Sequence, residues 1–162
     1  MRATMSGRAV ASETGSALVE MAVCLPVLLL LLFGSIDFGR VFYTAMELNN
    51  AARAGAQYGA YNLARSGNTA TMQTTATGAV NISGVSASAS RSCQCATDSG
   101  TFSATSPSAN NCTSPVATSC PSSHRVVTVT VVATKTFVTT ASFPGLPSSI
   151  ALSRTATLRV SE

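Results

Sequence analysis

The hydrophobic positions of the chain form one long block near its N-terminus. Every residue from 21 to 36 is apolar or small, and the wider segment 16–36 is broken by one charge, Glu20, and one proline, Pro26. A helix rises about 1.5 Å per residue, so residues 16–36 just span a hydrocarbon core of about 30 Å. The block therefore predicts a single membrane-spanning helix, which Pro26 is expected to kink because it lacks a backbone donor.

A second pattern, with a helical period, follows this block without a break. Residues 37–65 contain no proline, and small or apolar residues recur at steps of three and four: Val41, Ala45, Leu48, Ala52, Gly55 and Gly59. The two segments together predict one helix over residues 16–65. Gly55 and Gly59 form a small-xxx-small pair that lets another helix approach closely. That helix belongs either to a partner subunit or to the chain's own domain, and the pattern leaves both open.

The second half of the chain changes to a period of two. Residues 66–77 are polar and rich in helix-breaking residues, which predicts a linker or a frayed helix end. Residues 79–90 alternate weakly and predict one strand, whereas 125–140 are rich in β-branched residues and predict one or two strands. The clearest alternation lies in 150–160, whose apolar face comprises Ile150, Leu152, Ala156, Leu158 and Val160.

These elements predict an α+β fold, in which a long N-terminal helix leads into a small antiparallel sheet. Residues 91–123 lie between the predicted strands, contain three prolines and are expected to form a long loop. A sheet this small buries little by itself, so one of its faces is expected to pack on the upper part of the helix.

The predicted loop carries four of the five cysteines, Cys93, Cys95, Cys112 and Cys120, whereas Cys24 lies in the apolar block. Clustered cysteines in a Ser/Thr-rich region behind a hydrophobic segment indicate disulfides formed in an oxidising compartment, with Cys24 reduced. A bond between Cys93 and Cys95 would close a strained ring, so each is expected to reach Cys112 or Cys120, and both such pairings stay open. Four thiolates could instead bind zinc, and a Cys-x-Cys redox pair is a third interpretation, which lacks the βαβ pattern it needs.

Composition excludes several classes of function. Only 10% of the residues are charged, and the net charge of +4 comes from Lys and Arg residues scattered singly along the chain. Without a basic run, no nucleic-acid partner is predicted. The single histidine, His124, precedes a predicted strand, and the Gly-x-Ser-x-Gly pattern is absent. The sequence therefore predicts no catalytic site, cofactor or resident metal, and the chain is not expected to be an enzyme.

The start of the apolar block resembles a known processing motif. Residues 15–20, "GSALVE", followed at once by the block, are similar to a class III-type prepilin cleavage motif, with a Gly before the cut and a Glu five residues into the mature chain. Residues 15–61 resemble the TadE-like family of tight-adherence (Flp) pilus proteins, and 125–160 look like the closing strands of that family. The shared features are Glu20, Leu25-Pro26, Gly34, Asp37 and "NAARAGAQY" at 50–58.

The resemblance implies that residues 1–15 are a leader, which a prepilin peptidase removes between Gly15 and Ser16. Residues 16–65 would then form the mature helix, with a single pass through the inner membrane, and 66–162 a periplasmic or extracellular β domain with the Cys-rich loop. The implied function is that of a minor pilin or pseudopilin of a tight-adherence (Flp, type IVb) pilus, acting in assembly and adhesion. The implied partners are the peptidase, other pilins or pseudopilins, the inner-membrane assembly platform and membrane lipid.

Glu20 acquires a physical role under this interpretation. A carboxylate at the bilayer centre costs roughly 2.5–3.5 kcal/mol, and less near the interface. Cleavage creates an amine on Ser16, four residues earlier and on the same helix face. Glu20 could neutralise this amine in its own chain or in a neighbouring subunit, and the second arrangement would also set the axial register of an assembly.

A different class of function remains as the alternative. The chain could be a single-span anchored periplasmic module that binds a ligand through its Cys-rich loop, with Glu20 merely extending toward the lipid headgroups. The two hypotheses differ in the fate of the helix, because a pilin must leave the bilayer and pack on other helices, whereas an anchor stays.

Overall fold

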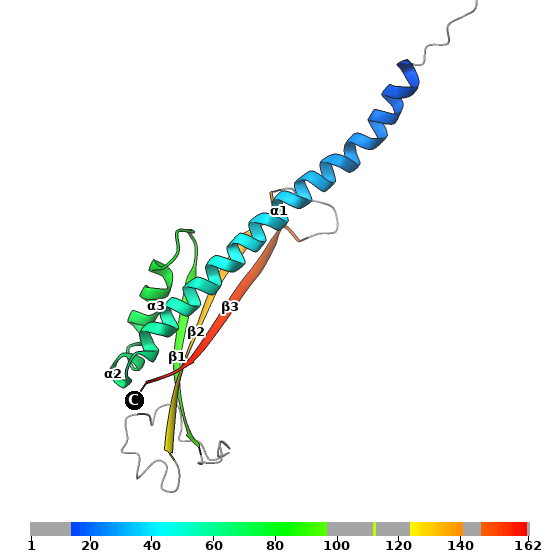
Figure 1. The fold of residues 1–162 in the computed structure, drawn as a ribbon. Helices are drawn as coiled ribbons and strands as arrows, with labels where there is room; N and C mark the ends of the chain where they lie inside the picture. The colour runs from blue at the N-terminus through cyan, green and yellow to red at the C-terminus, as the bar shows by residue number, and fades with distance from the viewer. Residues whose placement is uncertain (1–13, 97–111, 113–123, 141–146, 162) are drawn as a thin grey trace, which may run out of the picture. The chain divides into compact units, whose positions relative to one another are not determined.

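The computed structural model describes residues 14–96, 112, 124–140 and 147–161 of the chain. Within them the elements follow in the order α1 (Thr14–Ala60), α2 (Leu63–Ser66), α3 (Thr69–Gly78), β1 (Ser86–Ala96), β2 (His124–Val138) and β3 (Ser149–Arg159). Figure 1 shows the three strands side by side in one sheet. The predicted α+β fold, a long N-terminal apolar helix followed by a small antiparallel sheet, is confirmed.

The chain divides into two compact units, unit 1 (Met1–Gly39) and unit 2 (Arg40–Glu162). The described part of unit 1 is the first portion of α1, and its side chains at 15–36 are all exposed. The helix continues through Pro26, so the proline does not end it. In the described part of the chain, α1 is the one helix that is long and apolar enough to cross a membrane.

The helical region of unit 2 has different boundaries from those predicted. α1 ends at Ala60 rather than at residue 65, and the predicted linker over 66–77 is wrong, because most of it is α3. Asn62 and Asn68 precede α2 and α3, and each side chain accepts a hydrogen bond from the backbone N–H three residues later (2.8 and 3.1 Å). Asparagine satisfies the orphan N–H groups of a helix start in this way, and that signal was present in the sequence.

The sheet is antiparallel throughout, with β2 in its centre. β1 begins at Ser86 rather than at 79, because Gly84, whose φ is +75°, turns the chain just before it. Positive φ favours glycine over residues with a Cβ. At its other end β1 runs to Ala96 and so includes the first residues of the segment predicted as a loop. Residues 124–138 form one strand.

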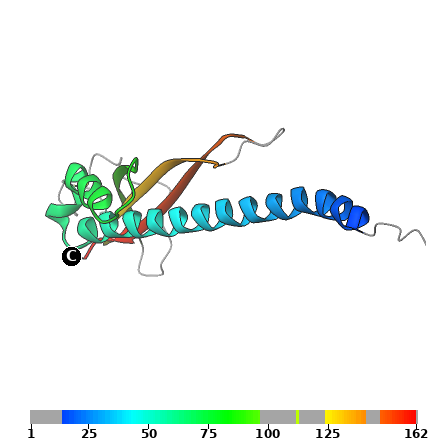
Figure 2. The same cartoon turned by 90° about the horizontal axis from the view of Figure 1, so that it is seen from above.

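The core of unit 2 lies on one face of this sheet. Alternate side chains of β2 are buried there: Val127, Val129, Val131, Ala133 and Phe137. They pack against small residues of α1, such as Ala56, and against Met72 and Ala76 of α3. Figure 2 shows the C-terminal part of α1 along the strands with α3 beside it. The predicted packing of the sheet on the upper helix is therefore present in unit 2.

Helix and strand match in length along this contact. From residue 40 to 60, α1 rises about 30 Å, and β2 extends about 33 Å from 137 back to 127. The two ends of the contact are marked by Arg40, which lies over the Phe137 ring, and by Ala60, whose carbonyl accepts a hydrogen bond from Ser161 N–H.

The opposite face of the sheet is covered with hydroxyl groups. Two serines of β1 and one threonine of β3 form hydrogen bonds with threonines of β2: Ser86 with Thr134 (2.8 Å), Ser92 with Thr128 (2.6 Å) and Thr157 with Thr130 (3.0 Å). Cross-strand hydroxyl pairs stabilise a sheet by a few tenths of a kcal/mol to about 1 kcal/mol each. The Ser/Thr-rich composition of the second half thus reflects a sheet with one polar face.

The predicted apolar face of β3 is covered only in part. Val160, just beyond the strand, is buried, and Leu152 and Ala156 are half-buried, but Ile150 and Leu158 are exposed. β3 is an edge strand, so the helices cover it less completely than they cover β2.

Candidate functional site

The first turns of α1 carry the residues that the sequence assigned to processing. α1 begins at Thr14, so Gly15 and Ser16 both lie in its first turn, and both are exposed. A Cβ built on Gly15 would meet no atom within 4 Å. Among the described residues, the space beside the Gly15 Cα is therefore open.

Glu20 is exposed and lies one turn beyond Ser16 on the same side of α1, because residues four apart share a helix face. Within the described residues, Glu20 has no hydrogen bond or ion pair, and the first turn of α1 contains no acidic residue. The helix dipole acts mainly within the first turn, so it contributes little to Glu20 in a helix that starts at Thr14.

The surface that follows Glu20 is apolar all round. The large side chains from Leu25 to Phe33 are 41–59% exposed, and none of the 18-residue apolar window of α1 is buried. A helix with apolar residues on every side is either enclosed in protein or placed in a membrane. Glu20 therefore stands at the border of a surface that water does not favour.

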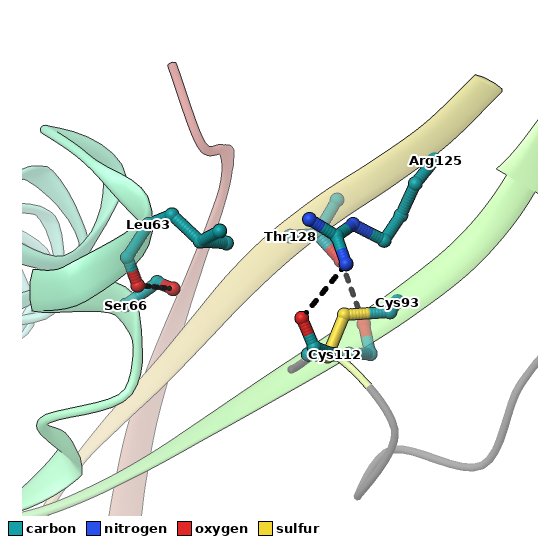
Figure 3. The surroundings of a disulfide bond; sticks show 7 residues. Leu63, Ser66, Cys93, Cys112, Arg125 and Thr128 are labelled. Carbon is teal, nitrogen blue, oxygen red and sulfur yellow. Dashed lines mark hydrogen bonds between the residues drawn. A yellow bond between two sulfur atoms is a disulfide. The ribbon is translucent and has the colours of Figure 1, made fainter. Parts of the chain in front are cut away.

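A disulfide in unit 2 joins Cys93 of β1 to Cys112, with their Cα atoms 5.6 Å apart. Both residues are buried, and Cys93 faces the core beside Val127. Figure 3 shows Arg125 reaching from β2 toward Cys112, whose carbonyl oxygen accepts a hydrogen bond from the guanidinium (2.9 Å). The bond and the guanidinium together hold residue 112 against the sheet.

This disulfide decides between the interpretations of the cysteines. Cys93 pairs with Cys112, which belongs to one of the two predicted pairings, and Cys95 is disulfide-bonded as well. The expected partner of Cys95 in that pairing, Cys120, lies outside the described residues. The sulfurs of Cys93 and Cys112 are used in a bond, so they are not zinc thiolates, and Cys93-x-Cys95 is not a redox pair. Cys24 is a free thiol.

Gly55 and Gly59 pack against the chain itself. A Cβ on Gly55 would lie 2.7 Å from the backbone oxygen of Met72 and 2.9 Å from the Cβ of Ala76. A Cβ on Gly59 would collide with the sulfur of Met72. The sequence left open whether this pair serves a partner helix or the chain's own domain, and the structure shows that α3 occupies it.

Two arginines with clear structural roles were missed in the sequence. Arg40 lies over the ring of Phe137, 5.2 Å from its centroid, and donates a hydrogen bond to the hydroxyl of Thr140. Arg125 is buried beside the disulfide. Neither residue has a recognisable sequence signal. About a hundred residues separate Arg40 from Phe137 and Thr140, and no sequence motif marks a buried arginine in a strand such as Arg125.

Comparison with known proteins finds one family model that is similar to part of the chain. The model of the TadE-like protein family matches residues 15–57, which include Gly15, Glu20 and Gly55. The match covers most of α1 and does not extend to the sheet. No curated protein and no solved structure matches the chain significantly. The resemblance stated from the sequence is confirmed over this region.

Proposed function

We propose that this chain, whose residues 15–57 match the TadE-like family, is a minor pilin or pseudopilin of a tight-adherence (Flp, type IVb) pilus. The observation that carries the proposal is the spacing of Gly15 and Glu20 at the start of an exposed apolar helix, within the matched region. In this role the chain has no catalytic group of its own. It contributes a helix that other subunits can bind.

Processing is the first step of the proposed function. A prepilin peptidase cleaves between Gly15 and Ser16, and the open surroundings of Gly15 support access to this bond. Because both residues lie in the first turn of α1, that turn must open before the bond can enter a protease site. Helix ends fray readily, so opening one terminal turn costs little.

The new amine on Ser16 supplies the positive charge that Glu20 lacks among the described residues. After cleavage the helix starts at Ser16, and the amine and the carboxylate are one turn apart on a common face. Pairing with the amine of a neighbouring subunit would remove two charges from an apolar surface and set the axial position of one helix against the next. This pairing is the reason we assign Glu20 to assembly.

The proposed location is the inner membrane, with one pass through α1 and the β domain in the periplasm, from which the chain can enter an extracellular pilus. The disulfides support an oxidising compartment for unit 2. The proposed partners are the prepilin peptidase, other pilins or pseudopilins, the inner-membrane assembly platform and membrane lipid. Adhesion would follow from the pilus to which the chain contributes.

Co-expression with a prepilin peptidase tests the processing step. The expected product, measured by intact mass and N-terminal sequencing of the membrane-extracted protein, begins at Ser16. Gly15→Leu should block cleavage, and Gly7→Leu, a second glycine of the expected leader, should leave it unchanged. An N-terminus near Asp37 would instead indicate signal peptidase and contradict the proposal.

The role of Glu20 is tested separately in cells that assemble the pilus. Glu20→Gln removes the charge at nearly constant size and should leave cleavage intact while abolishing incorporation of the chain or its effect on piliation. Glu47→Gln, the same change further along α1, is the matched control. Normal piliation with Glu20→Gln would remove the assembly role, and an uncleaved chain that stays in the membrane would favour the anchored ligand-binding module.

A further inference from the structure

A groove in unit 2 lies between α1 and the edge strand β3. It is lined by Asn49, Arg53 and Gln57 of α1 and by residues 155–158 of β3. The three helix residues are four positions apart, so they form one row along α1, and all three are exposed. The groove has a volume of about 410 Å³, against about 30 Å³ for a water molecule, so it has room for a segment of another chain.

The backbone of β3 is open toward this groove. Val160 N–H donates a hydrogen bond to the carbonyl of Val127 (2.8 Å), and bonded residue pairs alternate along an antiparallel ladder. The even-numbered residues of β3 therefore bond to β2, whereas the N–H and C=O groups of Thr155 and Thr157 point away from it. Among the described residues, these outward groups have no hydrogen-bond partner.

Outward backbone groups on both sides of this stretch are bonded within the chain. Ser161 N–H donates a hydrogen bond to the carbonyl of Ala60 (2.9 Å), and the carbonyl of Ser153 accepts one from the guanidinium of Arg154 (2.9 Å). The open part of the edge therefore lies between them and includes the residues that line the groove. β3 is an outermost strand of the sheet (Figure 1), and an unpaired edge can accept one more strand.

Charge indicates which kind of chain fits this edge. Arg53 has no hydrogen bond or ion pair within the described residues, and no Asp or Glu is among the described residues that line the groove. A second copy of the chain, paired edge to edge over this stretch, would bring the two Arg53 side chains toward one another. Like charges disfavour such pairing, whereas a segment with a carboxylate would neutralise Arg53.

We propose that the edge of β3 binds an extended segment of a partner protein by strand addition, with an acidic side chain of that segment against Arg53. Residues of an added antiparallel strand that lie opposite Thr155 and Thr157 share the hydroxyl face of the sheet. The residue between them, opposite Ala156, enters the groove. The favoured segment is therefore Ser/Thr, Asp/Glu, Ser/Thr, because hydroxyl pairs already join strands on this face. This inference depends neither on a role in a pilus nor on insertion of α1 in a membrane.

A peptide titration of the full-length chain in detergent micelles tests this inference. The probe is acetyl-Val-Thr-Glu-Thr-Val-amide, and NMR of the isotope-labelled chain measures hydrogen exchange at single backbone amides. Two control peptides separate the contributions. Lysine in place of the glutamate reverses the charge, and N-methylation of both threonines removes the amides that would pair with β3.

The probe should slow exchange at the amides of Thr155 and Thr157 and leave that of Ala156, already bonded to β2, unchanged. The lysine peptide should bind about fivefold more weakly, and so should the probe to Arg53→Ala, because one ion pair is lost. Arg65→Ala, which changes an exposed arginine outside the groove, should bind the probe as the parent does. The N-methylated peptide should not bind.

Unchanged exchange at Thr155 and Thr157 with millimolar probe would overturn the inference. Binding of the N-methylated peptide as tightly as the probe would also overturn it, because no strand would then be added. Equal affinities for the glutamate and lysine peptides would exclude an acidic partner. Slow exchange at both threonines before any peptide is added, with a dimeric mass in light scattering, would mean that a second copy of the chain occupies the edge.

Discussion

The two parts of α1 use one kind of secondary structure in opposite ways. In unit 1 the helix carries large apolar side chains, and all those at 15–36 are exposed. In unit 2 the buried positions of the same helix are mostly small: Thr44, Leu48, Ala51, Ala52, Gly55, Ala56 and Gly59. Lipid tails require only that a surface be apolar, whereas a sheet and a second helix require close approach. The size of the apolar residues, rather than their number, therefore distinguishes the two environments.

The largest expected effect on the free energy of unfolding comes from replacing a leucine by alanine, which is compared between the two parts of α1. Leu48 is fully buried, and Leu48→Ala should lower the free energy of unfolding of unit 2 by about 2–5 kcal/mol, because it leaves a cavity. Leu30→Ala removes an exposed side chain and should leave that free energy unchanged. Chemical denaturation of the full chain in detergent micelles measures both, and equal effects would contradict the comparison.

The disulfide offers the next contrast, between paired and free cysteines. Cys93→Ser combined with Cys112→Ser opens a loop of sequence separation 19 and should cost about 3 kcal/mol in the chain-entropy treatment. Cys24→Ser in unit 1 changes a free, exposed thiol and should cost nothing. Thermal unfolding in detergent compares the three proteins. A double variant as stable as the parent would mean that β1 and β2 hold the region without the bond.

Replacing glycine by alanine compares the two parts of α1 through a single added methyl group. Gly55→Ala places a Cβ against the backbone of Met72, a rigid neighbour, and should destabilise unit 2 by about 1–3 kcal/mol through overpacking. Gly34→Ala adds the same methyl group where nothing lies within 4 Å. It should leave the unfolding midpoint of unit 2 unchanged. A neutral Gly55→Ala variant would show that α3 can move away from α1.

The smallest expected effect concerns the start of α3. Asn68→Ala removes the side-chain acceptor of the Thr71 N–H and should cost about 1 kcal/mol. Asn81→Ala, at an exposed position outside the helices and strands, is the matched control and should change stability by less. Urea titration followed by circular dichroism resolves this difference. Equal midpoints would show that packing of Met72 and Ala76, rather than the cap, determines where α3 forms.

Periodicity in the sequence determined much of the fold. The unbroken apolar block and the steps of three and four predicted α1, alternation predicted β3, and the β-branched residues predicted most of β2. These patterns succeed because one face of each element meets a uniform environment over many residues. The Gly15–Glu20 spacing and the family resemblance were likewise available from local sequence, and the family match covers the same region.

Other features depended on tertiary contacts. The sequence left Gly55 and Gly59 with two possible partners, and only the position of α3 shows that the space beside them is filled within the chain. β1 has weak local alternation, and its place in the sheet depends on pairing with β2. Arg40 and Arg125 gain their roles from residues distant in sequence. Such contacts join segments that are distant in the sequence, and the pattern of one segment carries no information about the other. The sequence therefore determined which surfaces are apolar, and the tertiary structure determined what covers them.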